Sequence, residues 1–161
     1  MSRVAWFNCA AGTAGDMTLA ALVDAGADSL AVGAILGGLK IDDYALTFER
    51  TQRSGVSATR AIVAVHDHQA EDQHHHRSWK NISQLLQDSD LPDRVRSRAL
   101  TVFHVLAEVE AKIHHVSIDD IEFHEVGSVD AIIDIVGVCA DLEVLNIEKI
   151  SCSNIAVGHG H

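Results

Sequence analysis

The sequence feature that most constrains the fold is a row of apolar residues in the second half of the chain. Its members recur at alternating intervals of four and three: Val95, Ala99, Val102, Leu106, Val109 and Ile113. This period predicts one apolar seam along a long helix, and Pro92 suits the first turn of that helix because the first turn needs no N–H donor there. A partner helix could cover such a seam, but we expect it to pack within the same domain.

Shorter patterns predict the remaining elements, which alternate between strands and helices. In chain order, we expect a strand over 4–8, helices over 16–26 and 28–38, strands over 44–50 and 56–65, helices over 78–86, from Pro92 through Ile113 and over 128–146, and a strand over 148–155. Asp16 is expected to cap the first helix, and Arg53-Ser54-Gly55 to turn a hairpin. The order β-α-α-β-β-α-α-α-β predicts an α/β (α+β) fold, with a mixed β-sheet packed against several helices in a single domain over 1–161.

The charge balance excludes two classes of partner. The chain carries 12 lysine and arginine residues against 23 aspartate and glutamate residues, which gives a net charge of −11. Such an acidic surface disfavours nucleic acids and anionic membranes. The N-terminus lacks the shape of a signal peptide, no apolar run is long enough to cross a membrane, and the three cysteines form no C-x-x-C pair. We therefore expect a protein of the reducing cytoplasm.

Eleven histidines accompany these carboxylates, and five of them fall in the segment 66–76. Imidazole is a good ligand for nickel, zinc and copper, and a loop can gather several imidazoles around one ion. The segment therefore predicts metal binding, against the alternative of a solvated polar loop with incidental affinity. The predicted ligands are His66, His68, His74, His75 and His76.

A second group of candidate ligands precedes the apolar helix over 128–146. In Glu-Phe-His-Glu-Val-Gly over 122–127, His124 and Glu125 stand at the helix entrance, where they suit a metal ligand and a general base. Asp130 in the first helical turn either completes this ligand set or complements the helix dipole. The alternative is a surface loop whose Phe123 packs inward.

The same helix carries an acidic stripe. Asp130, Asp134 and Asp141 lie on one line with Gly137, and their sequence neighbours are apolar. The simplest interpretation is the exposed face of an amphipathic helix, and we adopt it for Asp141.

The loop between the first strand and the first helix is a candidate ligand site. Gly12 and Gly15 let a ligand approach the backbone, and the N-terminus of a helix attracts anions. The loop has neither the P-loop motif nor the dinucleotide-binding motif. Asp16 would repel a bare phosphate but could hold a metal ion that bridges to one.

Three blocks of the sequence resemble the LarC-type nickel-insertion proteins. Residues 8–17 resemble the family's Asp-Cys-x-x-Gly-x-x-Gly-Asp-Met, and the segment 66–76 resembles its His-rich loop. Residues 123–137 resemble its Phe-His-Glu-Val-Gly-x-x-Asp and Asp-Ile-Val-Gly block. The resemblance spans essentially the whole chain and corresponds to the N-terminal part of the family's full-length protein.

The sequence departs from the family pattern at four places, one of which is the terminal His159-Gly160-His161, where the family's Gly-rich loop normally continues. Asn8 stands where the family usually has an acidic residue, and Glu122 stands where many members have a further histidine. Arg77-Ser78-Trp79 follows the His-rich segment in place of the more frequent Arg-x-Leu. The changes at Asn8 and Glu122 affect any role that needs those side chains, although Glu122 can still ligate a metal.

The resemblance implies that the full-length protein inserts Ni²⁺ into pyridinium-3,5-bisthiocarboxylic acid mononucleotide and so forms a nickel-pincer cofactor. This nickel chelatase (lyase) reaction consumes CTP with Mg²⁺ or Mn²⁺, which a C-terminal portion absent here mainly binds. We therefore expect the isolated domain to be inactive alone. The expected partners are the mononucleotide, that C-terminal portion and a second copy in a homo-oligomer.

On this basis the imidazoles of 66–76 would capture Ni²⁺ and pass it to a site at His124, Glu125 and Asp130. Forming a nickel–carbon bond requires loss of a ring proton, for which His124 or Glu125 is the candidate base. The loop from Gly12 to Asp16 would hold the substrate phosphate through a cation. Two alternatives are a nickel-storage or metallochaperone module without catalysis, and a metal-dependent phosphohydrolase that uses Asp16, His124 and Asp130.

Overall fold

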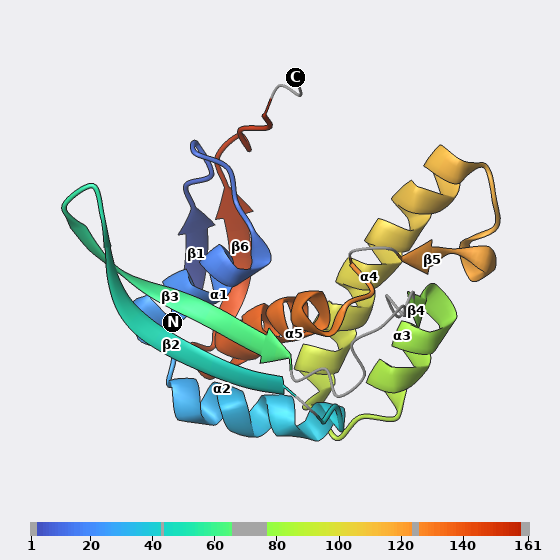
Figure 1. Cartoon of the computed structure of the whole chain (residues 1–161), viewed down its shortest axis with the longest axis horizontal. Coiled ribbons are helices and arrows are strands. Elements are labelled where there is room, and N and C mark those ends of the chain that lie inside the picture. The colour runs from blue at the N-terminus through green and yellow to red at the C-terminus, as the bar shows by residue number, and fades with distance from the viewer. Residues whose placement is uncertain (1–2, 43, 66–76, 124–125, 159–161) are drawn as a thin grey trace.

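The structure, a computed structural model, describes residues 3–42, 44–65, 77–123 and 126–158 and combines helices with three pairs of strands (Figure 1). Its elements are β1 (Arg3–Phe7), α1 (Gly15–Asp24), α2 (Ser29–Leu36), η1 (Gly37–Leu39), β2 (Tyr44–Arg53), β3 (Val56–Val65), β4 (Arg77–Ser78), α3 (Trp79–Gln87), α4 (Asp93–His114), η2 (Ile118–Asp120), β5 (Glu122–Phe123), α5 (Val129–Val144) and β6 (Ile147–Cys152). The predicted α/β class and the order of its main elements are confirmed. Parallel and antiparallel pairing both occur, divided between β1–β6, which is parallel, and the antiparallel pairs β2–β3 and β4–β5.

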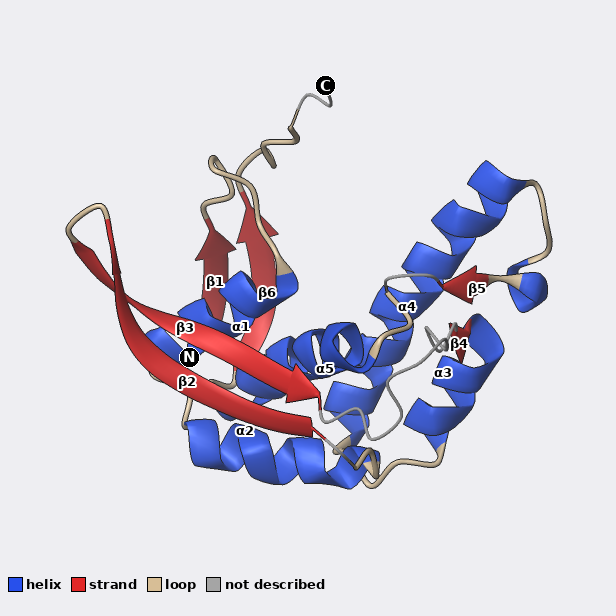
Figure 2. Ribbon diagram, in the orientation of Figure 1, coloured by secondary structure: helices blue, strands red, loops and turns tan. Residues whose placement is uncertain are grey.

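Helix α5 lies at the centre of the core, and α1, α2, α4 and the hairpin strand β3 pack around it (Figure 2). Its side chains Ile132, Ile133 and Val136 are fully buried. This burial explains why the segment is almost wholly apolar, because a helix surrounded by other elements has no broad solvent-facing side. Among the described helices, none combines the length and the hydrophobicity that a membrane crossing requires.

The seam predicted on α4 is confirmed at Val95 and Ala99, and Leu106 packs against the core, but the prediction is wrong at Val102, Val109 and Ile113. The buried residues follow at a constant interval of four: Val95, Ala99, Phe103, Ala107 and Ala111. Val102, Val109 and Ile113 are instead 41%, 49% and 64% exposed. Residues four apart form the ridge used by helices that cross, whereas the alternating four and three suits helices that run side by side. Helix α4 crosses α5 and packs against it (Figure 2).

The hairpin and two of the helix starts form where local sequence predicted them. Ser54 and Gly55 turn the hairpin with φ values of 49° and 82°, the left-handed pair that a two-residue turn needs. Asp28 accepts the Leu30 N–H at 2.9 Å as the cap of α2, and Ser78 accepts the Asn81 N–H at 3.1 Å as the cap of α3. These elements depend on residues that are close in sequence.

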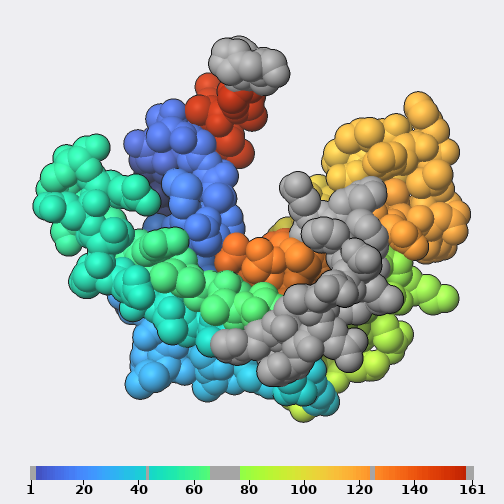
Figure 3. All heavy atoms as spheres, viewed as in Figure 1, coloured from blue at the N-terminus to red at the C-terminus, as the bar shows by residue number. Residues whose placement is uncertain are grey.

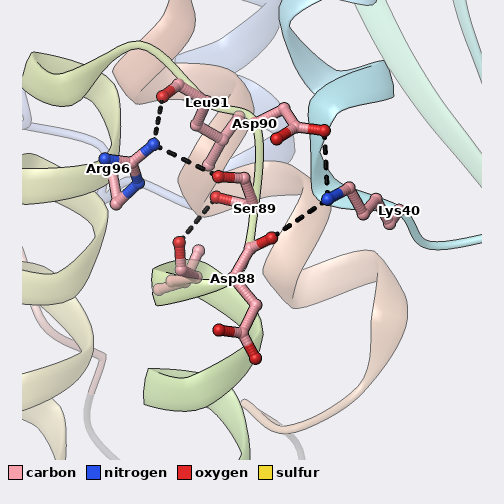
Figure 4. A network of polar contacts seen from close by, with 7 residues as sticks. Lys40, Asp88, Ser89, Asp90, Leu91 and Arg96 are labelled. Carbon is pink, nitrogen blue, oxygen red and sulfur yellow. Dashed lines mark hydrogen bonds and ion pairs between the residues drawn. The ribbon is translucent and has the colours of Figure 1, made fainter.

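A polar network holds the connection between α3 and α4 against the end of α2 (Figure 4). The Arg96 guanidinium donates to the carbonyl oxygens of Ser89 at 3.2 Å and Leu91 at 2.7 Å. Lys40, which directly follows η1, pairs with Asp90 at 3.0 Å. The network thereby fixes the point at which α4 begins and ties the α3–α4 connection to the residue that follows η1.

Candidate metal and substrate site

The N-terminal part of α5 forms the floor of a hollow in the molecular surface. Figure 3 shows this floor between the arm that contains β1 and the start of α1 and the arm that contains the outer end of α4. Helix α1 packs directly against α5 at this point. The acidic stripe of α5 and the loop that precedes α1 therefore meet, although more than a hundred residues separate them in the chain.

Asp134 makes the closest contact between the two elements. A Cβ atom on Gly15 would lie 2.7 Å from the Asp134 Cβ, so residue 15 must be glycine for the helices to approach this closely. The Asp134 carboxylate accepts the backbone N–H of Asp16 and so satisfies a donor at the start of α1. The predicted capping role of Asp16 is wrong, because Asp16 lies inside the first turn and the N-cap position is Ala14, which has no polar side chain.

The electrostatics of this contact favour a bound cation. Burial, followed by the nearby charges of Asp16 and Asp130, raises the pKa of Asp134 to about 6. One Asp134 oxygen, Oδ1, is buried without a hydrogen-bond partner among the described residues. A divalent cation would relieve the repulsion between these carboxylates. In the part of the chain that the structure describes, however, no three His, Cys, Asp or Glu side chains are placed to hold a metal, so further ligands are needed.

The predicted histidine ligands His66, His68, His74, His75 and His76, and the pair His124 and Glu125, lie outside the described residues. Their roles therefore stay predictions.

The residues that flank the two histidine-containing segments pair with each other in β4–β5. Arg77, which directly follows the His-rich segment, is the register partner of Phe123, which directly precedes His124. Arg77 also donates to the Gly127 carbonyl at 2.9 Å. A side chain on Gly127 would come within 2.9 Å of the Phe123 carbonyl oxygen, so the glycine permits this tight packing. The pair β4–β5 thus fastens the ends of both predicted metal-binding segments to each other.

The loop before α1 is fixed by backbone contacts with the segment after β6. The Cys9 carbonyl accepts the N–H groups of both Gly12 and Ala156 at 3.0 Å. Gly12 has a φ of 87°, in the left-handed region that favours glycine. Asn8 accepts the Ala10 N–H at 3.2 Å, a turn contact that the usual acidic residue could also make. The departure at Asn8 therefore leaves the loop geometry intact.

Asp141 does not lie on an exposed face, so that prediction is wrong. Its residue is 0% exposed, neither carboxylate oxygen has a hydrogen-bond partner among the described residues, and burial raises its pKa to about 8. Within the acidic stripe, Asp130 is exposed, Asp134 is half-buried and Asp141 is buried, so the stripe turns inward along α5 past Gly137. A Cβ atom at Gly137 would lie 2.9 Å from a methyl carbon of Leu19 on α1.

A groove beside Asp16 was not predicted from the sequence. It has a volume of ≈ 580 Å³ and lies between α1 and the hairpin, with Arg53 and Arg60 among its lining residues. Asp134 was also left out of the predicted ligand set, although it stands one helical turn after Asp130. That spacing was the available signal for Asp134, whereas the groove forms only when α1 packs on the hairpin.

The chain combines carboxylates on the floor of a hollow with a histidine-rich segment. Carboxylate and imidazole groups are metal ligands, so this combination is typical of a metal-handling domain. The family model described as nickel insertion protein matches residues 5–161, and the chain therefore belongs to the nickel insertion protein family. No solved structure matches the chain closely enough to identify a relative.

Curated relatives match almost all of this chain. It is 41% identical over 160 residues to the pyridinium-3,5-bisthiocarboxylic acid mononucleotide nickel insertion protein of Staphylococcus saprophyticus, covering 99% of this chain and 40% of the relative. It is 42% identical to a putative nickel insertion protein of Gloeobacter violaceus and 43% identical to one of Thermomicrobium roseum, covering 98% of this chain in both cases and 37% and 38% of those relatives. The chain thus spans about two fifths of the length of the relatives it matches.

Proposed function

We propose that this chain binds Ni²⁺ and delivers it for insertion into pyridinium-3,5-bisthiocarboxylic acid mononucleotide, the compound in the name of the Staphylococcus saprophyticus relative. In this proposal nickel is the cargo. The imidazoles of His66, His68, His74, His75 and His76 capture the ion, and a site formed with His124, Glu125 and Asp130 receives it. The three cysteines are free thiols, which suits the reducing cytoplasm in which we place the reaction.

The observation that carries the proposal is the β4–β5 pair. Because Arg77 and Phe123 are register partners, the chain leaves the His-rich segment at the same place where it enters His124. An ion released from one segment therefore has a short path to the other. A nickel-storage segment that works independently of an insertion site would not require the pairing of β4 with β5.

The carboxylates on α5 and α1 give the ion a destination. Asp134 keeps one oxygen without a partner among the described residues, and the charges of Asp16 and Asp130 act on it. These groups supply part of a coordination shell, and His124 and the sulfur atoms of the substrate would supply the rest. Asp16 would also hold a cation that bridges from the Gly12–Gly15 loop to the substrate phosphate.

Forming a bond between nickel and a ring carbon removes one ring proton. We assign His124 or Glu125 as the base that accepts this proton, because in the sequence both closely precede α5, whose first turn carries Asp130. CTP with Mg²⁺ or Mn²⁺ would act through the rest of the longer protein. We accordingly expect this chain alone to bind nickel without completing the insertion.

Nickel titration of the parent chain and of the H74A/H75A/H76A variant tests the proposal. We expect the variant to lose several weak sites and to keep one tighter site, because the receiving site does not depend on those three imidazoles. Calorimetry measures both the stoichiometry and the affinity. Loss of all nickel binding in the variant would contradict a receiving site and would favour a storage module.

A further inference from the structure

We infer that the groove between α1 and the β2–β3 hairpin binds the mononucleotide substrate, with its phosphate held by Arg53 and Arg60. The inference rests on the proposed function for the identity of the substrate, because a mononucleotide carries both a phosphate and a ring that must reach the nickel site. The groove itself is a feature of the described residues.

The shape of the groove suits a small flat ligand. Its lining includes Ala20 and Ala21 from α1 and every residue from 58 to 61 of β3. Consecutive residues of a strand point to opposite faces, so a cavity lined by four in a row follows the edge of the strand. In the described part of the chain this edge of β3 has no neighbouring strand, because β3 pairs with β2 alone. Small side chains and free backbone groups thus border the space.

Two arginines give the groove its charge. Arg53 and Arg60 have neither a hydrogen-bond partner nor an ion-pair partner among the described residues, whereas the nearby Arg50 is paired with Asp24. Unpaired guanidinium groups stand out in a chain whose net charge is −11. The planar donor array of guanidinium matches phosphate oxygens, so an anionic phosphate is the ligand that these side chains would bind best.

The acidic residue at the same end of the groove is already neutralised. Asp24 accepts a hydrogen bond from the Thr59 hydroxyl at 2.8 Å and forms an ion pair with Arg50. The Thr59 hydrogen bond, together with the Arg50 charge, lowers the pKa of Asp24. This carboxylate therefore stays occupied by its own partners and offers little repulsion to a phosphate.

The groove is polarised along its length. Arg60 follows Thr59, which contacts Asp24 at the C-terminal end of α1, and Arg53 lies still nearer the hairpin turn. Asp16 lines the groove from the other end of α1, eight residues or about 12 Å away. A mononucleotide with its phosphate at the arginines would direct its pyridinium ring toward Asp16, where a nickel ion would lie between the carboxylates and the sulfur groups of that ring. That orientation brings the ring to Asp134 and the carboxylate floor.

Titration with nicotinate mononucleotide, a pyridinium ribonucleotide that carries one phosphate, tests the inference on the full 161-residue chain without nickel. We expect R53Q and R60Q each to weaken binding by about tenfold, because each removes a charge-assisted hydrogen bond. K80Q is the matched control, since Lys80 is an exposed cation on α3 outside the groove, and it should bind as the parent does. Ala21→Met, which fills the groove without altering charge, should also weaken binding.

Two further ligands identify what the groove recognises. The nicotinate riboside, which lacks the phosphate, should bind more weakly than the mononucleotide and should be insensitive to R53Q and R60Q. Equal binding of riboside and mononucleotide would overturn the inference, as would unchanged affinity in both arginine variants. Binding of CTP at the arginines in preference to the mononucleotide would overturn the assignment of the substrate.

Nickel titration of the same samples separates this inference from the proposed function. A chain that keeps its tight nickel site but shows no arginine-dependent mononucleotide binding would overturn the groove assignment alone. A chain that binds the mononucleotide through Arg53 and Arg60 but lacks the tight nickel site would uphold the groove and contradict the proposed nickel site.

Discussion

Asp141→Asn is expected to raise the free energy of unfolding by about 4 kcal/mol at pH 7. The Asp141 carboxyl is 0% exposed and without a hydrogen-bond partner among the described residues, and burial raises its pKa from 3.8 to about 8. At neutral pH the unfolded chain therefore ionises this group while the folded chain keeps it protonated. The asparagine side chain has the same shape and carries no charge in either state, so the variant avoids this loss of stability.

The sign of the effect fixes its dependence on pH. The folded pKa lies above the unfolded pKa, so the contribution of Asp141 is fully present below about pH 4 and is lost as the pH rises toward 8. Urea unfolding at pH 4, 6 and 8 measures the difference between parent and variant, in which the other titrating groups cancel. The exposed Asp119→Asn change is the control and should leave the profile unaltered. A parent–variant difference that does not grow with pH would show that Asp141 ionises freely in the folded chain.

Gly15→Ala is expected to destabilise the fold by about 1–3 kcal/mol and to weaken nickel binding at the carboxylate floor. The new methyl group would lie 2.7 Å from the Asp134 Cβ and 2.8 Å from an oxygen of its carboxylate. The atoms of Asp134 nearest its backbone cannot swing away, so α1 and α5 must separate. The hydrogen bond from the Asp16 N–H to Asp134 would lengthen as a result.

Gly33→Ala is the matched control for this change. Gly33 is an exposed glycine inside α2, and a Cβ atom there would meet nothing within 4 Å. Alanine is the better helix former, so this variant should gain up to about 1 kcal/mol. Chemical unfolding and nickel titration on both variants check the prediction. Equal stabilisation by the two alanines would show that Gly15 has room for a side chain and that the contact with Asp134 is looser than described.

The fold was predictable where its elements depend on nearby residues. The turn at Ser54-Gly55 and the cap at Asp28 follow from local backbone and hydrogen-bond requirements, and both formed as expected. The buried side of α4 was not predictable from its own period, because its valines and its alanines offer two competing faces. Packing of α4 against α5, α3 and η2 buries the line of Ala99, Ala107 and Ala111 and leaves Val109 exposed.

The candidate site was predictable only in part. Asp16 and Asp130 were predicted as site residues from two separate motifs. Helix α1 packs on α5, and the charges of both residues raise the pKa of Asp134. The inward orientation of Asp134 and Asp141 depends on Gly15 and Gly137, whose missing side chains allow that packing. Arg53 and Arg60 were not predictable as site residues, because nothing in the hairpin sequence indicates that α1 forms the other wall of a groove.

The central claim is that carboxylates of α5 and α1 help to hold the nickel ion that the histidines capture. Its most direct test is the nickel affinity of the tight site in the H74A/H75A/H76A background, compared with the same chain carrying Asp134→Asn or Asp119→Asn. We predict that Asp134→Asn weakens that site by about tenfold or more, because it removes a carboxylate beside the ion, and that Asp119→Asn has no effect. An unchanged affinity in the Asp134→Asn chain would contradict the account.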